Sequence, residues 1–361
     1  MKKKSFINKL MSGAFALMTV VSMTSCQGFV NAVMGYEDNS SSGTTTPTTT
    51  PTTPTQDQYI FTIQNAVYVD DNFPQATTTD VIEGLQINLQ AIRGGQNMIT
   101  VTTQQQYNRF FVGLQDQRGY WSLIPVGIGE AIGENVARRT ESGYLIPIMY
   151  TMLFTQDITM LIAAEDANGN ITTPLVVTIH FINTNTDVSD LNVSLTFQNE
   201  KDVDLHMYTP SGRHIYFGDK GGEVTLTDGR VVSFGLDLDS NPACNIDGIK
   251  NENIYIPKEL VETGTYIIKV DMFSNCDPSI STDWAVVARY NNNLLTNEIG
   301  SNPAFGTYPV NAPDGDHTTV MQFTINGASG TRGVETAVDW STFKTYPISE
   351  SARFKIENTI W

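Results

Sequence analysis

The stretch KDVDLHMY (residues 201–208) decides the fold of the part of the chain around it. Polar and apolar residues alternate along it, and this period of two predicts a half-buried β-strand. Successive side chains of a strand point to opposite faces. Asp202, Asp204 and His206 therefore share one face, and the apolar side chains between them share the other. We expect the apolar face to lie on a core and the acidic face to lie outside it.

A second stretch with the same pattern, LDLD (236–239), places Asp237 and Asp239 on one face of another strand. If the two strands meet, four carboxylates converge, and like charges so close raise one another's pKa or require a cation. Ca²⁺ accepts about six to eight oxygen ligands, and Asn241 and Glu252 supply further oxygens. The alternative is a solvated acidic face on an acidic protein. The predicted site is a structural Ca²⁺ site formed by Asp202, Asp204, Asp237, Asp239, Asn241 and Glu252.

These motifs resemble the YfaP-type family, a bacterial envelope domain of unknown function. The shared motifs are DVDLH (202–206), PSG (210–212), GG (221–222), LDLD (236–239), ENI (252–254) and GTY (264–266). The resemblance covers about residues 191–326 and implies a β-sandwich with no established enzymatic activity. One departure is the inserted segment 223–234, which can lengthen a hairpin without touching the site.

The N-terminus predicts a bacterial lipoprotein signal. A lysine-rich start precedes an apolar segment, residues 14–21, that is too short to span a bilayer, and MTSC (23–26) resembles a lipobox. Cleavage before Cys26 leaves this cysteine to carry the lipid, whose chains anchor the protein to a membrane. We therefore expect residues 1–25 to be the signal peptide and the protein to be lipid-anchored in the cell envelope, in the outer membrane of a Gram-negative bacterium. The alternative is an ordinary signal peptide with a chance cysteine.

Residues 26–57 are expected to be the lipidated N-terminus and a disordered linker. The stretch 44–55 contains only Thr and Pro, so it cannot bury a core. The formal net charge is −17, and removal of residues 1–25, which contain four lysines and no acid, brings it to −21. So acidic a chain excludes nucleic acid as an expected partner, since phosphate backbones bind basic surfaces.

The rest of the sequence predicts an all-β protein with two tandem β-sandwich domains, the first immunoglobulin-like and the second jelly-roll-like. Short strand-like runs fill residues 58–186, and the hairpin around Asn168-Gly169 resembles the final hairpin of bacterial immunoglobulin-like domains. Residues 187–330 form the YfaP-type sandwich, and residues 331–361 form a C-terminal extension packed on one of the sandwiches. Strands of the second sandwich are expected near 191–198, 202–208, 213–217, 231–239, 265–272, 284–290 and 318–325.

Cys244 and Cys276 remain once Cys26 is assigned to the lipid anchor. An even number of cysteines in an oxidising compartment predicts that the two form a disulfide. Both cysteines belong to loops close to the proposed metal site, so the bond is expected to brace it.

The sequence contains no HExxH zinc motif, GxSxG elbow, P-loop or dinucleotide fingerprint. We therefore expect a non-catalytic envelope lipoprotein that binds an unidentified protein or glycan partner or scaffolds the cell surface, with His206 and His214 as structural residues. The alternative is a glycan-binding surface lipoprotein of a nutrient-uptake system, because aromatic rings stack on the apolar faces of sugars. The rings available for such contacts are those of Tyr120, Trp121 and Trp284.

Overall fold

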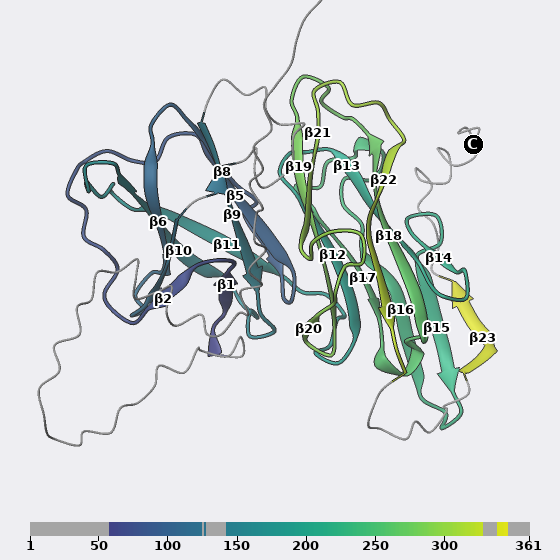
Figure 1. The fold of residues 1–361 in the computed structure, drawn as a ribbon. Coiled ribbons are helices and arrows are strands. Elements are labelled where there is room, and N and C mark those ends of the chain that lie inside the picture. Colours follow the sequence, from purple (N-terminus) through teal and green to yellow (C-terminus); the bar gives the residue numbers. More distant parts are fainter. Residues whose placement is uncertain (1–57, 125, 128–141, 328–337, 346–361) are drawn as a thin grey trace, which may run out of the picture. The chain divides into compact units, whose positions relative to one another are not determined.

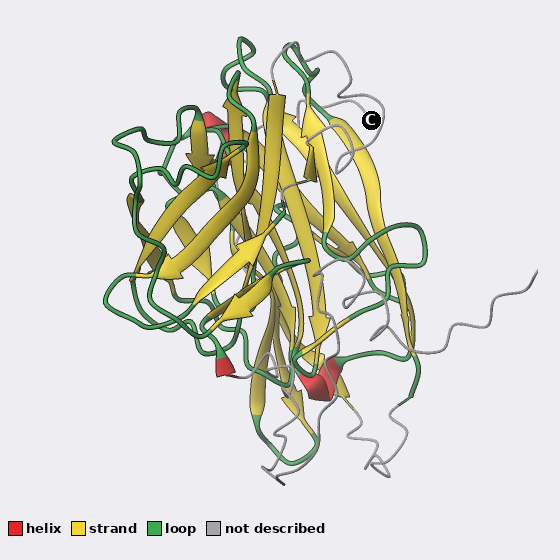
Figure 2. Ribbon diagram, turned by 60° about the vertical axis from the view of Figure 1, so that its left-hand side comes forward, coloured by secondary structure: helices red, strands yellow, loops and turns green. Residues whose placement is uncertain are grey.

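The computed structural model describes residues 58–124, 126–127, 142–327 and 338–345. Their regular secondary structure consists almost entirely of β-strands, joined by loops and a few short 3-10 turns (Figures 1 and 2). The predicted signal peptide, Cys26, the Thr/Pro linker and most of the C-terminal extension lie outside the described residues. Among the described residues, no helix has both the length and the apolar character needed to cross a membrane.

Two sheets form the first sandwich. One sheet has the strand order β1-β9-β5-β3, with β8 beside β9, and the other has the order β2-β7-β6-β10-β11-β4. Ile99 and Ile146 of the first sheet share one core with Phe110 and Ile162 of the second, so the two sheets pack face to face. The strands are β1 (Phe61–Ile63), β2 (Val67–Val69), β3 (Leu85–Ile87), β4 (Gln90–Ile92), β5 (Gln96–Thr103), β6 (Tyr107–Leu114), β7 (Tyr120–Leu123), β8 (Val126–Gly127), β9 (Ser142–Tyr150), β10 (Ile158–Asp166) and β11 (Leu175–Ile182).

The hairpin predicted around Asn168-Gly169 is confirmed, because β10 and β11 pair antiparallel on either side of it. The Asp166 carboxylate fixes the turn by accepting the backbone N–H groups of Asn168 at 2.8 Å and Asn170 at 2.9 Å. Such side-chain acceptors are the reason that Asp and Asn favour tight turns.

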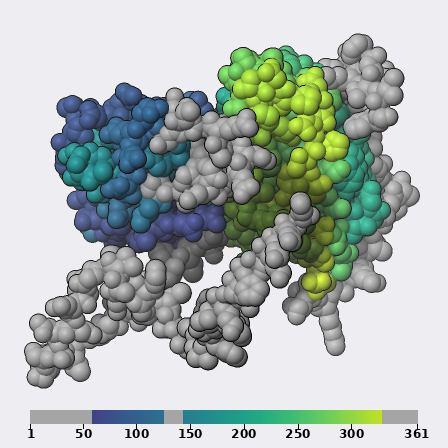
Figure 3. Space-filling view, turned by 45° about the horizontal axis from the view of Figure 1, so that its top comes forward, coloured from purple at the N-terminus to yellow at the C-terminus, as the bar shows by residue number. Residues whose placement is uncertain are grey.

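The second sandwich pairs a larger sheet of order β20-β19-β12-β17-β16-β15-β23, with β21 beside β19, and a smaller sheet of order β14-β13-β18-β22. Its strands run from teal to yellow in the sequence colours, and its described surface follows the same colours in the space-filling view (Figures 1 and 3). The strands are β12 (Leu191–Phe197), β13 (Asp202–Tyr208), β14 (His214–Ile215), β15 (Gly221–Leu226), β16 (Val231–Leu238), β17 (Asn251–Ile256), β18 (Gly264–Ser274), β19 (Thr282–Tyr290), β20 (Asn293–Leu294), β21 (Ala304–Tyr308), β22 (Asp316–Ile325) and β23 (Val338–Thr345).

All the strands predicted for this sandwich are present, and they show that the protein is all-β. Sequence reasoning missed β15, β17, β20, β21 and β23. β15 and β16 form a hairpin, which agrees with the inserted segment 223–234. β23 pairs with β15 at the edge of the larger sheet, so this part of the C-terminal extension belongs to the second sandwich.

The prediction that β13 is only half-buried is wrong. Val203, Leu205 and Met207 enter the core as expected, but Asp202 and Asp204 on the opposite face are also buried. Phe217, from the segment between β14 and β15, covers that polar face. Its ring lies 6.0 Å from that of His206 and 4.4 Å from that of Phe273 on β18.

Gly221 of the GG motif and Gly235 allow β15 and β16 to approach closely. Gly221 faces Gly235 in the register of the hairpin. Gly235 has φ +134°, and a Cβ atom there would overlap the backbone oxygen of Lys220. Only glycine fits this position, both for its backbone angle and for the space around it.

We predict that Gly235→Ala lowers the free energy of unfolding by roughly 3 kcal/mol or more, because the methyl group meets backbone that is fixed by strand pairing. Gly212→Ala is the matched control: it also has a positive φ, +87°, but nothing lies within 4 Å of its Cβ position. The control should lose only about 1–2 kcal/mol. Urea denaturation followed by circular dichroism measures both, and equal losses would contradict the steric explanation.

Candidate functional site

Three carboxylates converge in the second sandwich. Asp204 lies on β13, Asp239 directly follows β16, and Glu252 lies on β17. Each contributes an oxygen that lies within 4.8 Å of the other two. β13 belongs to the smaller sheet, whereas β16 and β17 are neighbours in the larger one. The carboxylates therefore come from both sheets, and β13 and β16 are not paired with each other. We call Asp204, Asp239 and Glu252 the carboxylate cluster.

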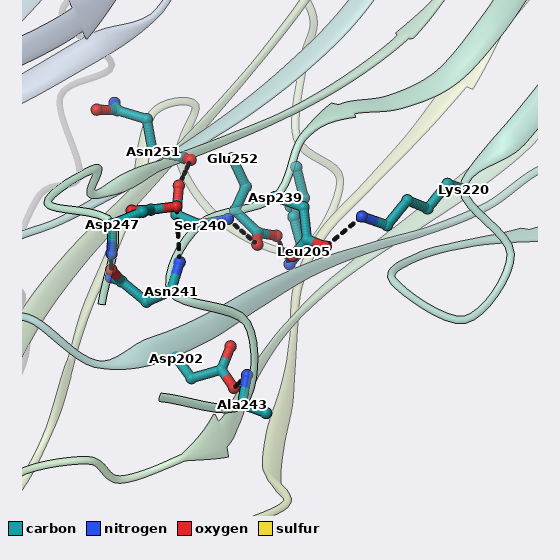
Figure 4. A network of polar contacts seen from close by, with 10 residues as sticks. All are labelled: Asp202, Leu205, Lys220, Asp239, Ser240, Asn241, Ala243, Asp247, Asn251 and Glu252. Atoms are coloured by element: carbon teal, nitrogen blue, oxygen red, sulfur yellow. Dashed lines mark hydrogen bonds and ion pairs between the residues drawn. The ribbon is translucent and has the colours of Figure 1, made fainter. Parts of the chain in front are cut away.

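Glu252 is held in place by two backbone N–H groups (Figure 4). Its Oε2 accepts the N–H of Leu205 on β13 at 2.6 Å, and its Oε1 accepts the N–H of Ser240 at 3.3 Å. β14 pairs with β13 only at Met207 and Tyr208, which leaves the Leu205 N–H without a strand partner on that edge. The Glu252 side chain therefore takes the place of a neighbouring strand.

Asp204 is buried without a hydrogen-bond donor. It is 2% exposed, and neither of its carboxylate oxygens has a hydrogen-bond partner among the described residues. Oδ1 of Asp239 is also buried without a hydrogen-bond partner among the described residues. Its Oδ2 forms an ion pair with Nζ of Lys220. Burying an ionised carboxylate without a partner is costly, so the carboxylate cluster requires protons or a cation.

The same burial shifts the acidity of the cluster. It raises the pKa of Asp204 well above its usual value, and the charge of Glu252 adds to the effect. Burial also raises the pKa of Glu252, followed by the charge of Asp239, although the N–H of Leu205 acts in the opposite direction. Without a cation, these surroundings therefore favour the protonated forms of Asp204 and Glu252.

Asp202, the first residue of β13, holds the loop 240–244 beside the cluster. Its Oδ2 accepts the N–H of Ala243 at 2.7 Å. Asn241, Ala243 and Cys244 all have a left-handed backbone, with φ of 55°, 51° and 60°. Such angles cost residues with a side chain on the order of 1–3 kcal/mol each and are found where the surroundings fix the chain. The loop is thus held in one shape next to the cluster.

The predicted disulfide is confirmed and closes this loop. Cys244 and Cys276 are bonded, with their Cα atoms 5.5 Å apart. Lys201 acts at the same place: it is fully buried, and its Nζ donates to the side-chain oxygen of Asn275 and the backbone oxygen of Asp277. A covalent bond and a buried ammonium therefore both attach the segment 275–277 to the site.

Three of the six predicted metal ligands lie outside the carboxylate cluster, namely Asp202, Asp237 and Asn241. Asp237 accepts the N–H of Asn185 at 2.6 Å and the side-chain amide of Asn253 at 2.7 Å. A register shift between Leu236 and Leu238 breaks the alternation at this point, which separates Asp237 from Asp239. The prediction that Asp237 and Asp239 share one face of a regular strand is therefore wrong.

Asn241 is buried and serves the loop. Its Nδ2 donates to the backbone oxygens of Lys201 at 2.9 Å and Ile249 at 3.0 Å, and its Oδ1 accepts the N–H of Asp247 at 3.1 Å. Figure 4 shows its amide beside Asp247, on the loop that follows Asp239. Its hydrogen bonds therefore give it a role in shaping the loop.

His206 and His214 lie on the paired strands β13 and β14, with Nδ1 of His206 2.9 Å from Nε2 of His214. Burial lowers the pKa of His206 to about 3 and that of His214 to about 4, so both are neutral at pH 7. The His214 ring is stacked between Tyr208 and Tyr216, at 4.1 and 3.9 Å. The four rings line a cavity of about 270 Å³.

The three aromatic residues proposed for glycan contact do not lie in one site, because two belong to the first sandwich and one to the second. Tyr120 and Trp121 are half-buried on β7 and line a cavity of the first sandwich. Trp284 is only 7% exposed and packs within the core of the second sandwich, over Gly306. The expected glycan contact at Trp284 is therefore wrong, because its ring has no face open to a ligand.

Comparisons with known proteins do not assign the chain to a family. No protein-family model and no curated protein matches the chain. A Bacteroides ovatus glucan-utilisation protein, SGBP-B in complex with a mixed-linkage heptasaccharide, is 12% identical over 56% of this chain and 40% of its own, with a TM-score of 0.18. The D00–D0 domain of intimin is 13% identical over 52% of this chain and 91% of its own, with a TM-score of 0.14. Both scores are too low to support an argument about function, and the YfaP-type resemblance stays a prediction.

Sequence reasoning missed the two lysines of the site. Lys201 and Lys220 directly flank the DVDLH and GG motifs, but nothing in their spacing shows that one is buried and the other faces Asp239. Buried lysines are rare unless they are paired. Only the folded chain supplies the carbonyl and carboxylate oxygens that pair them.

We predict that replacing both Cys244 and Cys276 by Ser lowers the free energy of unfolding by roughly 3–4 kcal/mol. The bond closes a loop over a sequence separation of 32 residues and so restricts the unfolded chain. Cys26→Ser is the matched control, since it removes a cysteine and leaves the bond intact. Thermal unfolding of the three proteins measures the effect, and a double variant as stable as the control would show that the bond contributes nothing.

Proposed function

We propose that the chain is a non-catalytic, lipid-anchored protein of the cell envelope with a binding or scaffolding role, and that its second sandwich holds a structural Ca²⁺ in the carboxylate cluster. The observation that supports the cation is the Asp204 carboxylate, which is buried with no hydrogen-bond donor among the described residues. Buried charges are paired or coordinate metals.

The charge and chemistry of the cluster favour Ca²⁺ over other ions. Three ionised carboxylates and the Lys220 ammonium leave a formal charge of −2, which one divalent cation neutralises. All three ligands of the cluster are oxygens, which hard cations prefer, whereas zinc prefers nitrogen and sulfur. Ca²⁺ also tolerates irregular geometry, which suits ligands that come from two sheets and a loop.

The position of the cluster supports a structural role for the cation. Glu252 and Asp204 are 0% and 2% exposed, so the ion would lie largely inside the protein. The ligands connect β13 of the smaller sheet to β16 and β17 of the larger sheet. A bound ion would therefore stabilise the sandwich around the loop 240–244 and leave other surfaces free to bind partners.

We predict that millimolar Ca²⁺ raises the melting temperature of the chelator-treated protein, because binding to the folded state stabilises it by about 2.7 kcal/mol at one hundred times the Kd. Asp204→Asn should abolish this shift. Asp237→Asn is the matched control: it removes a half-buried carboxylate that is bonded to Asn185 and Asn253, and it should keep the shift. Differential scanning calorimetry with and without Ca²⁺ distinguishes the two variants.

The same experiment has a pH dependence of defined sign. In chelator, Asp204 and Glu252 have raised pKa values in the folded state, so the unfolded chain loses these protons first as the pH rises above about 4. Stability in chelator should therefore fall with rising pH, and the stabilisation by Ca²⁺ should be larger at pH 7.5 than at pH 5. An unchanged melting temperature at both pH values would leave the cluster without a cation and refute the proposal.

The anchor has its own test, which concerns residues outside the described part of the chain. We predict that Cys26 carries lipid, because MTSC (23–26) follows a lysine-rich start and a short apolar segment. Cells grown with a fatty-acid analogue should label the wild-type protein and not Cys26→Ala. A Cys26→Ala variant that still carries the label and sediments with membranes would contradict the lipobox.

A further inference from the structure

An aromatic cavity lies at one end of the first sandwich, far along the sequence from the carboxylate cluster. Its volume is about 170 Å³, and its wall includes Tyr59, Tyr68, Tyr120 and Trp121. Tyr68 on β2 and Trp121 on β7 are partners in the strand register, and Tyr59 precedes β1. β2 is the edge strand of its sheet, so the cavity lies where the sheet ends.

The rings form one contiguous aromatic surface. Tyr59 and Tyr68 lie 4.4 Å apart, and Trp121 contacts each of them edge-on at 5.3 Å. All three are only half-buried, although the opposite side of Trp121 packs on the core. Aromatic faces carry partial negative charge and attract polarised C–H groups. Part of this surface therefore faces solvent where a ligand can stack on it.

The rim of the cavity is polar and close to neutral. Arg118 forms an ion pair with Asp70, from Nε to Oδ1 at 2.9 Å, and its Nη2 donates to the Asp70 backbone oxygen at 2.8 Å. The amides of Gln58 and Gln117 are exposed beside it. Because the charges neutralise each other, the rim offers hydrogen bonds in several directions without selecting an ionic ligand.

We infer that this cavity binds one sugar ring of a neutral polysaccharide. A pyranose has an apolar C–H face for the rings of Tyr59 and Trp121 and a rim of hydroxyls for the amides and the Arg118–Asp70 pair. At about 170 Å³ the cavity is smaller than the roughly 300–1,000 Å³ that encloses a drug-sized ligand, so it holds one ring and leaves the rest of the chain outside. The site is independent of the proposed Ca²⁺ and gives the glycan alternative a defined place.

Affinity electrophoresis of the mature chain, with Cys26→Ser in place of the lipid, tests this proposal. Native gels containing a soluble β-glucan, a galactomannan or a xylan provide the neutral probes, and polygalacturonate provides the acidic one. At least one neutral polysaccharide should slow the protein, and polygalacturonate should not. Tyr59→Ala and Tyr68→Ala should each weaken the retardation at least tenfold in Kd, while the chain keeps its melting temperature.

Tyr208→Ala is the matched control, since it removes a half-buried tyrosine from the histidine-lined cavity of the other sandwich. It should be slowed as strongly as the wild type. The proposal is overturned if none of the three neutral polysaccharides slows the wild type, or if both tyrosine variants of the first sandwich are slowed as much as the wild type. It is also overturned if Tyr208→Ala alone loses the retardation, because the sugar would then occupy the other cavity.

Discussion

The burial of Asp204 is the constraint on which the second sandwich depends. A carboxylate removed from water needs compensation at the place where it lies, and the penalty for leaving it unpaired amounts to several kcal/mol. The surroundings answer this need only in part. Lys220 compensates Asp239, and backbone N–H groups compensate Glu252, but the two oxygens of Asp204 have no donor among the described residues. The loop 240–244, the disulfide and the buried Lys201 then fix the chain next to the carboxylates.

The period of two in the sequence correctly predicted which faces of β13 carry acids and which carry apolar residues, because that property is local. It could not predict what covers the acidic face. Phe217 is ten or more residues further along the chain, and its placement over His206 depends on the turn between β14 and β15. The same limit applies to Glu252. The motif identifies it as an acid, but its two backbone donors come from β13 of the smaller sheet and from the loop after β16.

Asp237 and Asp239 show a second limit of pattern reasoning. LDLD reads as a regular strand, but the ladder between β16 and β17 shifts at Leu236 and Leu238. A shift of one residue moves a side chain to the other face of a strand, and the four letters give no sign of it. The predicted glycan contact at Trp284 was wrong for a related reason, since a tryptophan is equally suited to a core and to a ligand surface. The disulfide could be predicted by counting cysteines. The prediction required only their number and the oxidising compartment, and no knowledge of the geometry.

The contact between Glu252 and Leu205 has a consequence for how the protein meets copies of itself. Strands that end a sheet expose unpaired backbone groups, and these are templates for pairing with another chain. From Asp202 to His206, β13 lacks a strand partner on one edge among the described residues, and the Glu252 carboxylate occupies that edge from the opposite sheet. The Glu252 side chain satisfies the Leu205 amide and is itself buried, so this part of the edge offers no free N–H to another chain. The residue that completes the cluster thus also protects the sheet against intermolecular β-pairing.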